Sequence, residues 1–180
     1  RSVDGGGAWA KVAGTGSDQI TSNNFHDIVY NFKDNHFYVS NDNDILKSPT
    51  GNLDDWTSIG RGKPGFLTNV NRIEFAQCPS DPMIIYAIGA VGSFSSNTAV
   101  TNDGGESWLL RTEPAIFGGY GQAWYDLELT VDPSNCFHIL SGGVVLSEST
   151  FQGLTWRSIA ENVHSDHHNI TFDPTNLGRT

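Results

Sequence analysis

The residues best suited to chemistry gather in two short stretches, and the first is VHSDHHNITFDP at 163–174. It contains His164, Asp166, His167 and His168, and imidazole with carboxylate can bind a metal such as zinc. On an extended strand His164, Asp166 and His168 share one face and His167 takes the other. They are therefore candidate metal ligands. However, no fourth ligand is identifiable, so a hydrogen-bonded His–Asp pair that fixes the loop is preferred, and no cofactor is expected.

The second stretch, GQAWYDLELTVDP at 121–133, combines aromatic rings with a carboxylate. Trp124 and Tyr125 can offer flat rings to a sugar face. Asp126, together with Asp166 or Asp27, is a candidate for the two carboxyls that a glycosidase places about 5–9 Å apart across the scissile bond. The sequence itself does not show that these side chains converge.

Composition excludes two classes of partner. The 180 residues carry 10 Lys plus Arg against 20 Asp plus Glu, a formal net charge of −10, which repels nucleic acid and anionic membranes. No apolar run of about 20 residues is present, so no membrane insertion is expected. Cys78 and Cys136 can form one bridge or stay as two thiols, and their similar turn contexts in different repeats favour thiols.

A repeat of about fifty residues organises the chain. Octets ending in tryptophan recur as SVDGGGAW (2–9), TNDGGESW (101–108) and STFQGLTW (149–156), with a longer copy, SPTGNLDDW (48–56). Their tryptophans are separated by 47, 52 and 48 residues. The repeated positions are Ser2, Asp4, Gly6 and Trp9; Trp56; Thr101, Asp103, Gly105 and Trp108; and Ser149, Gly153 and Trp156.

Alternating segments fill the space between the octets. LELTVDPSNCFHIL (127–140) matches IEFAQCPSDPMIIY (73–86), and each reads as a strand, a turn and a second strand. One short strand leads into each octet, and the tryptophan opens another. Four antiparallel strands per repeat predict an all-β fold, a β-propeller.

The predicted blades cover approximately residues 22–66, 67–115 and 122–162. Residues 1–15 are expected to supply an outer strand of a preceding blade, and 163–180 an inner strand of a following one. We therefore expect one domain, a partial propeller, whose first partner is the remainder of its own propeller, since open sheet edges would leave backbone groups unpaired.

The octets themselves are interpreted as structural turns. The Asp accepts hydrogen bonds from its own turn, the Gly supplies a positive φ, and the Trp contributes a large apolar contact. SVDGGGAW and TNDGGESW resemble the Asp-boxes of sialidase-type, sortilin-type and xyloglucanase-type propellers. The resemblance implies that the octets lie on the outer rim, away from a ligand site.

Residues 70–180 also resemble the large secreted Asp-box proteins of Bacteroidota. The shared features are GQAWYD followed by HSDHH, at comparable spacing. Many such proteins use type IX secretion, so the resemblance implies an extracellular or cell-surface location. It implies no defined reaction.

A ligand site is predicted where the first strands of the blades begin, at one mouth of the central channel. Aligning these strands on their turns places Arg72, Asp126 and His167 at equivalent positions, with His26 or Asp27 in the remaining repeat. The predicted ligand-binding residues are Arg72, Trp124, Tyr125, Asp126 and His167.

Two functions fit this pattern. The preferred one is a non-catalytic module that binds glycan or a surface protein as part of a larger secreted protein. The alternative is a glycoside hydrolase, xyloglucanase-like or sialidase-like, with Asp126 and Asp166 as candidate catalytic residues. Sialidases use three arginines and a tyrosine nucleophile, and only Arg72 falls on the predicted ring. A sortilin-like peptide receptor is a third possibility.

Overall fold

The computed structural model describes residues 1–12, 24–159 and 162–173. These residues form three four-stranded sheets and no helix, so none of them belongs to a helix that could cross a membrane. The first sheet contains β1 (Phe25–Asn31), β2 (His36–Asn41), β3 (Ile45–Ser48) and β4 (Thr57–Ser58). The second contains β5 (Arg72–Gln77), β6 (Ile85–Val91), β7 (Phe94–Thr101) and β8 (Leu109–Leu110). The third contains β9 (Glu128–Asp132), β10 (Asn135–Gly142), β11 (Leu146–Ser149) and β12 (Arg157–Ser158).

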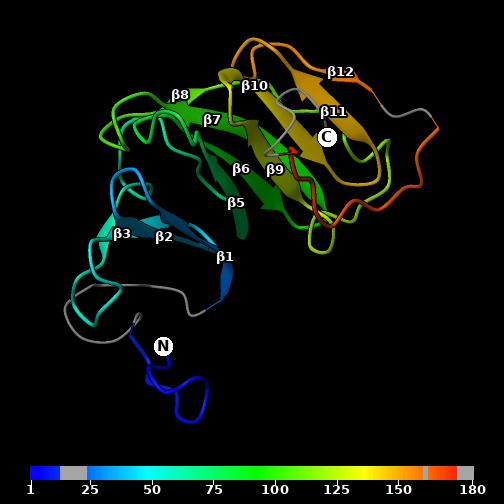
Figure 1. Ribbon diagram of the computed structural model, residues 1–180. Coiled ribbons are helices and arrows are strands. Elements are labelled where there is room, and N and C mark those ends of the chain that lie inside the picture. Colours follow the sequence, from blue (N-terminus) through cyan, green and yellow to red (C-terminus); the bar gives the residue numbers. More distant parts are fainter. Residues whose placement is uncertain (13–23, 160–161, 174–180) are drawn as a thin grey trace.

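Each sheet is an antiparallel meander in which strands follow one another in chain order. The first strand of each sheet contacts its counterpart in the next, because β1 packs beside β5 and β5 beside β9. Figure 1 shows these three strands toward a common side, with the later strands of each sheet leading away from it. The first strands are therefore called the inner strands.

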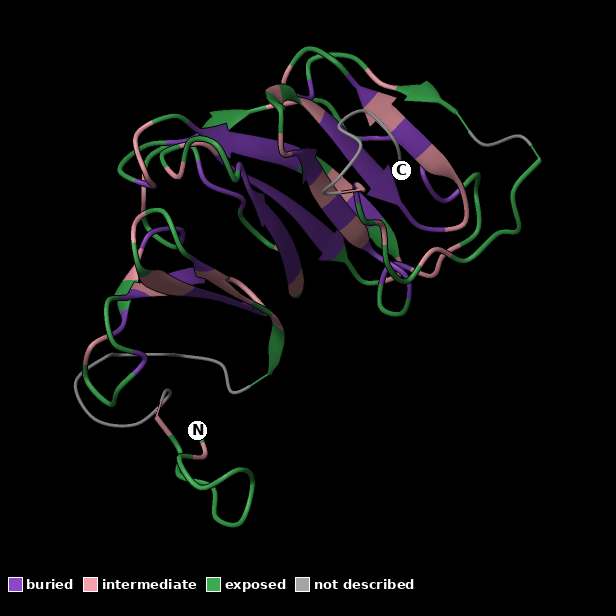
Figure 2. Ribbon diagram, viewed as in Figure 1, coloured by how far each residue is buried: buried purple, intermediate pink, exposed green. Residues whose placement is uncertain are grey.

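Burial follows this arrangement (Figure 2). The second sheet has a neighbour on both faces, and its strands β5 and β6 are almost continuously buried. Strand β1 has a neighbouring sheet on one side only among the described residues, and its first residues are exposed. One core cluster lies between the first and second sheets, including Tyr38, Ile73 and Trp108, and another lies between the second and third, including Tyr86 and Leu127.

The tryptophan-ended turns are closed by their own side chains. In the turn at 101–108, Thr101 Oγ1 donates to Asp103 and accepts from the Gly105 N–H at 3.0 Å. Asp103 Oδ1 also accepts from the Ser107 N–H at 3.0 Å. Gly105 has φ of 98°, and a Cβ there would lie 2.5 Å from the Cβ of Ile59, so the position requires glycine.

The tryptophans connect each sheet to the segment that precedes it. Trp108 Nε1 donates to the Ile59 carbonyl at 2.8 Å, which lies just after β4. Trp156 Nε1 donates to the Thr112 carbonyl at 3.1 Å, just after β8, and Trp56 Nε1 to the Val12 carbonyl at 2.8 Å. We call these three bonds the indole clips.

Cys78 and Cys136 form a disulfide, so the preference for two thiols was wrong. The bridge forms because of the similar turn contexts of the two cysteines, the same feature from which thiols were predicted. Equivalent turns in adjacent repeats follow inner strands that lie side by side, which brings the two Cα atoms to 5.4 Å. The bridge therefore joins the second and third sheets beyond the ends of β5 and β9.

The predicted flanking strands are not formed in the described residues. Neither 1–12 nor 162–173 contains a strand, and residues 13–15 and 174–180 lie outside the described part. A strand needs a hydrogen-bonded neighbouring strand, and neither segment has one here. The second segment is nevertheless attached to the third sheet, because the His167 N–H donates to the Gly143 carbonyl at 2.8 Å.

The indole clips predict unequal effects of two tryptophan substitutions. Trp108 is 3% exposed and Trp9 is 77% exposed. Trp108→Ala removes a buried ring and an inter-sheet hydrogen bond, so it should lower the free energy of unfolding by about 3–5 kcal/mol. Trp9→Ala is the matched control and should cost about 0.5 kcal/mol or less. Urea unfolding measures both, and equal effects would contradict the role assigned to the clip.

Candidate functional site

Three carboxyls, one from each inner strand, interact electrostatically on the side where those strands begin. They are Asp27 on β1, Glu74 on β5 and Glu128 on β9. The Asp27 charge raises the pKa of both glutamates, and the Glu74 charge raises the pKa of Glu128. Glu74 is only 7% exposed. The cluster was missed by the sequence analysis, which considered only the residues just before each strand. The signal was present as a glutamate in each of the equivalent segments IEF and LEL.

Arg72 is the cation within this acidic cluster. Its guanidinium bonds Glu74 Oε1 at 2.8 and 2.9 Å. It also donates to the carbonyls of Ala123 and Leu127, at 3.2 and 3.3 Å. Arg72 therefore joins the acidic cluster to the loop that carries the aromatic stretch predicted from the sequence.

The pKa values of the two glutamates reflect burial. Burial raises the pKa of Glu74 to about 7, although Arg72 opposes the change. Burial also raises the pKa of Glu128 to about 7, and the charges of Glu74 and Asp27 raise it further. Burial raises the pKa of Asp27 as well, against the Ile28 N–H that bonds it. At neutral pH, Glu74 and Glu128 can therefore hold or release a proton.

Beside Arg72 lies an aromatic shelf formed by Trp124, Tyr125 and His168. Trp124 is 66% exposed and Tyr125 is 54% exposed, with ring centroids 5.4 Å apart. The His168 ring meets Tyr125 edge-on, with centroids at 4.4 Å. Large rings at this exposure present apolar faces to solvent next to polar groups, which is an arrangement suited to a sugar ring.

Asp126 and Asp166 converge at the same place. Gln122 Nε2 donates to Asp126 Oδ2 at 3.2 Å and to Asp166 Oδ1 at 2.8 Å. Asp126 is fully buried, and its Oδ1 has no hydrogen-bond partner. Burial raises the pKa of Asp126 and the Asp166 charge raises it further, whereas His168 and Gln122 lower it. Gln122 was also missed, because only the folded turn brings it to both carboxyls.

The aromatic shelf with Gln122, Asp126 and Asp166 is called the mouth site. Of the predicted ligand-binding residues, the structure brings Trp124, Tyr125 and Asp126 together, with Arg72 bonded to the same loop. His167 is placed differently, because its backbone and Cβ lie against Gly142 and Gly143. In the first repeat, His26 bonds Asp42 at 2.9 Å, so Asp27 is the residue that belongs to the acidic cluster.

The prediction that His164, Asp166 and His168 share one face of a strand was wrong. Residues 162–173 form no strand, and Asp166 adopts a left-handed conformation with φ of 71°, which ends the alternation of side chains. His164 Nδ1 donates to the neighbouring Ser165 carbonyl, while Asp166 and His168 contact Gln122 and Tyr125. Within the described part of the chain, no group of three such side chains could hold a metal.

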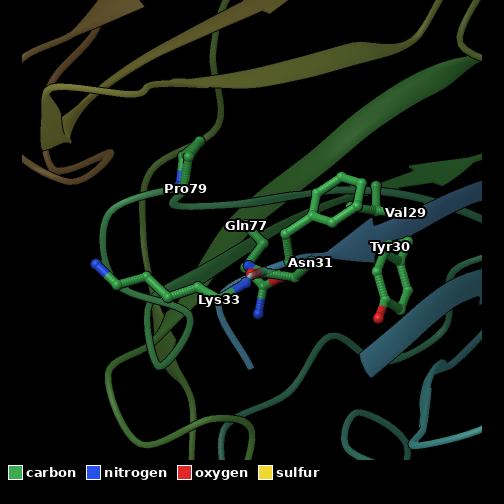
Figure 3. Close-up of a pocket in the computed structure, with 7 residues that line it drawn as sticks. Val29, Tyr30, Asn31, Lys33, Gln77 and Pro79 are labelled. Carbon is green, nitrogen blue, oxygen red and sulfur yellow. Dashed lines mark hydrogen bonds between the residues drawn. The ribbon is translucent and has the colours of Figure 1, made fainter. Parts of the chain in front are cut away.

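A separate groove of about 390 Å³ lies at the opposite ends of β1 and β5 (Figure 3). Asn31 Nδ2 donates to Gln77 Oε1 at 2.7 Å across it, and Lys33 Nζ bonds the Ser80 carbonyl. Its lining includes Tyr30 and the exposed Phe32 but no carboxyl or imidazole group. It therefore lacks the acid–base groups of the mouth site.

Three solved structures resemble the chain. A GH74 enzyme of Niastella koreensis matches with a TM-score of 0.62 at 18% identity, over 84% of this chain and 24% of that one. A GH74 xyloglucanase of Xanthomonas campestris matches with 0.51 at 22% identity, over 69% and 19%. An ancestral GH74 enzyme matches with 0.54 at 19% identity, over 77% and 19%.

The fold is a β-propeller. Its four-stranded antiparallel sheets are blades of the kind found in these glycoside hydrolases, and the chain is a partial propeller. It spans about a quarter or less of the length of the structures it matches. No protein-family model matches the chain, and no curated protein sequence is similar to it.

The raised pKa values predict a pH-dependent cost of the acidic cluster. A carboxyl whose pKa rises from 4.5 to about 7 on folding keeps its proton in the folded state between these values, so stability falls as the pH rises through that interval. Glu128→Gln removes the ionisation. At pH 8 the variant should be more stable than the wild type by about 1 kcal/mol or more, and at pH 4 it should be equal.

Urea unfolding at the two pH values makes the comparison, because all other ionisable groups are common to both proteins. Glu106→Gln is the control, because Glu106 is exposed and pairs with Lys63 at 2.9 Å. Losing this surface ion pair should leave the protein equally or slightly less stable at pH 8, the opposite direction to Glu128→Gln. A Glu128→Gln effect that is the same at pH 4 and pH 8 would refute the assignment.

Proposed function

We propose that the chain is a glycan-binding part of an extracellular Asp-box β-propeller protein, with the ligand at the mouth site. The observation that carries this proposal is the pair of exposed rings, Trp124 and Tyr125, beside the buried carboxyl of Asp126. Aromatic faces stack on the apolar faces of sugar rings, and fixed polar groups at their edge orient the hydroxyls. A surface protein is the alternative ligand.

The charges of the site favour a neutral glycan. Arg72 bonds two carbonyls of the loop that carries the mouth site, and Glu74 already neutralises it at 2.8 Å. Asp166 adds negative charge beside the aromatic shelf, and this charge contributes to the raised pKa of Asp126. An anionic sugar such as a sialic acid or a uronic acid would therefore meet repulsion from Asp166, while the Arg72 guanidinium is already paired with Glu74.

Location outside the cell is supported by the disulfide. Bridges such as Cys78–Cys136 persist in oxidising compartments and are rare in the cytosol. The Asp-box turns and the resemblance to secreted Bacteroidota proteins point the same way, and we propose type IX secretion as the export route. The remainder of the propeller is the expected first partner.

Hydrolysis is the second candidate function, and one observation favours it. A single amide nitrogen bonds Asp126 and Asp166, so the bonded oxygens lie within about 6 Å of each other, comparable with the ~5–5.5 Å carboxyl separation of retaining glycosidases. The buried Asp126, with its raised pKa, has the character of a general acid, and Asp166 is the second carboxyl. The similarity to GH74 enzymes is consistent with this role.

Binding is tested with two aromatic substitutions. Trp124→Ala removes the exposed ring and should weaken binding of xyloglucan oligosaccharides or another glycan selected on an array by about fivefold or more, because stacking contributes ~1 kcal/mol or more. Phe151→Ala is the matched control, since Phe151 is equally exposed at 64% but lies on a turn between β11 and β12. Calorimetry gives both affinities, and equal losses would contradict the proposed site.

Turnover is tested with the same protein. If the chain takes part in hydrolysis, reducing ends released from xyloglucan or a panel of fluorogenic glycosides should fall at least a hundredfold in Asp126→Asn, which can no longer donate a proton. Binding of the oligosaccharide should persist in that variant. Undiminished hydrolysis in Asp126→Asn would exclude Asp126 as the acid.

A further inference from the structure

Gln122 organises the mouth site with both its backbone and its side chain. Its carbonyl accepts from the Tyr125 N–H at 2.7 Å and from the Asp126 N–H at 3.2 Å. Its side-chain nitrogen donates to Asp126 and Asp166. One residue thus fixes the turn that presents the aromatic shelf and also joins the two carboxyls, which are 40 positions apart in the chain.

The two carboxyl contacts determine the orientation of the Gln122 amide. A primary amide nitrogen has two hydrogens, and the two acceptors use both. The Oε1 atom faces no hydrogen-bond donor among the described residues, so it remains an acceptor that a ligand hydroxyl can use. The amide therefore donates through its nitrogen and can accept through its oxygen. A carboxylate lacks the donor, and an apolar side chain lacks both.

Asp126 depends on this contact more than an exposed carboxyl would. It is fully buried, its Oδ1 has no partner, and Gln122 supplies the side-chain hydrogen bond to its Oδ2. Asp166 is exposed and holds a left-handed backbone conformation with φ of 71° while it bonds the same amide. An unusual backbone conformation persists where the surroundings determine it, and here Gln122 is the partner that reaches the side chain.

We propose that Gln122 is the positioning residue of the mouth site. It holds the carboxyls of Asp126 and Asp166 next to the same bound ligand, and its Oε1 accepts a hydrogen bond from a ligand hydroxyl. This inference rests on the proposed glycan-binding function for its ligand, but its positioning part concerns the free protein. The charged groups that face Asp126 are Asp166 and His168. Burial and the Asp166 charge raise the pKa of Asp126, and the hydrogen bond from Gln122 opposes them. Loss of that bond should therefore raise the pKa of Asp126 further.

The positioning role is tested without any ligand. Carboxyl ¹³C NMR follows the titration of Asp126 and Asp166 in the wild type, in Gln122→Leu and in Gln122→Glu. The Asp126 midpoint should rise in Gln122→Leu, because the donated hydrogen bond that lowers the pKa is lost, and it should rise further in Gln122→Glu, which replaces the donor with a third acceptor. Gln152→Leu is the control, because Gln152 Nε2 bonds Asn102 on the exposed surface. Unchanged midpoints in both Gln122 variants would overturn the inference.

Ligand binding supplies the second readout. Calorimetry with xyloglucan oligosaccharides, or with the glycan selected on the array, should show about tenfold weaker binding in Gln122→Leu and no change in Gln152→Leu. Full affinity in Gln122→Leu would overturn the ligand contact. If the wild-type protein binds no glycan, the proposed function is wrong. The positioning role is then still decided by the titration of Asp126, which needs no ligand.

Discussion

The three indole clips, made by Trp56, Trp108 and Trp156 to the backbone of the preceding segment, are the constraint on which the structure depends. Trp108 reaches the Ile59 carbonyl and Trp156 reaches the Thr112 carbonyl, so the outer strand of each sheet is tied to the end of the sheet before it. The Cys78–Cys136 bridge adds a second connection near the inner strands. The second and third sheets are thus held together both at the rim and near the inner strands, which restricts the angle between them. Because that angle is restricted, the starts of β5 and β9 must lie close together.

Bringing the carboxyls of the three inner strands together costs stability, and this cost indicates where the functional site lies. Asp27, Glu74 and Glu128 are brought together with one arginine among them, and the pKa values of both glutamates rise to about 7. A sequence selected for stability alone would place apolar side chains there. Mutually repelling carboxyls are instead typical of sites that handle ligands or protons. The turns at the rim show the opposite pattern, because Asp103 is fully satisfied by its own turn and its pKa is lowered to about 2.

Much of the fold could be predicted from the sequence, because it depends on local chemistry. The spacing of the tryptophans and the alternation in LELTVDPSNCFHIL predicted four-stranded blades, and the sheets are formed. The site was predicted less completely. Trp124, Tyr125 and Asp126 are contiguous and could be recognised, whereas Gln122 acquires its role only when a turn and a distant segment meet. An inner strand is predicted over 163–180, but residues 162–173 form none here. Asp166 has a left-handed backbone, and sequence alternation cannot reveal a single backbone angle.

The central claim is that ligands bind where the inner strands begin, and that the tryptophan-ended turns at the rim only connect the sheets. A crystal structure of the protein soaked with a glycan that it binds tests this claim most directly. The account predicts density for a sugar ring against Trp124 and Tyr125, with a hydroxyl near Gln122 and Asp126. Density against a rim turn, such as the one carrying Trp9, or in the groove between Val29 and Pro79, would contradict it.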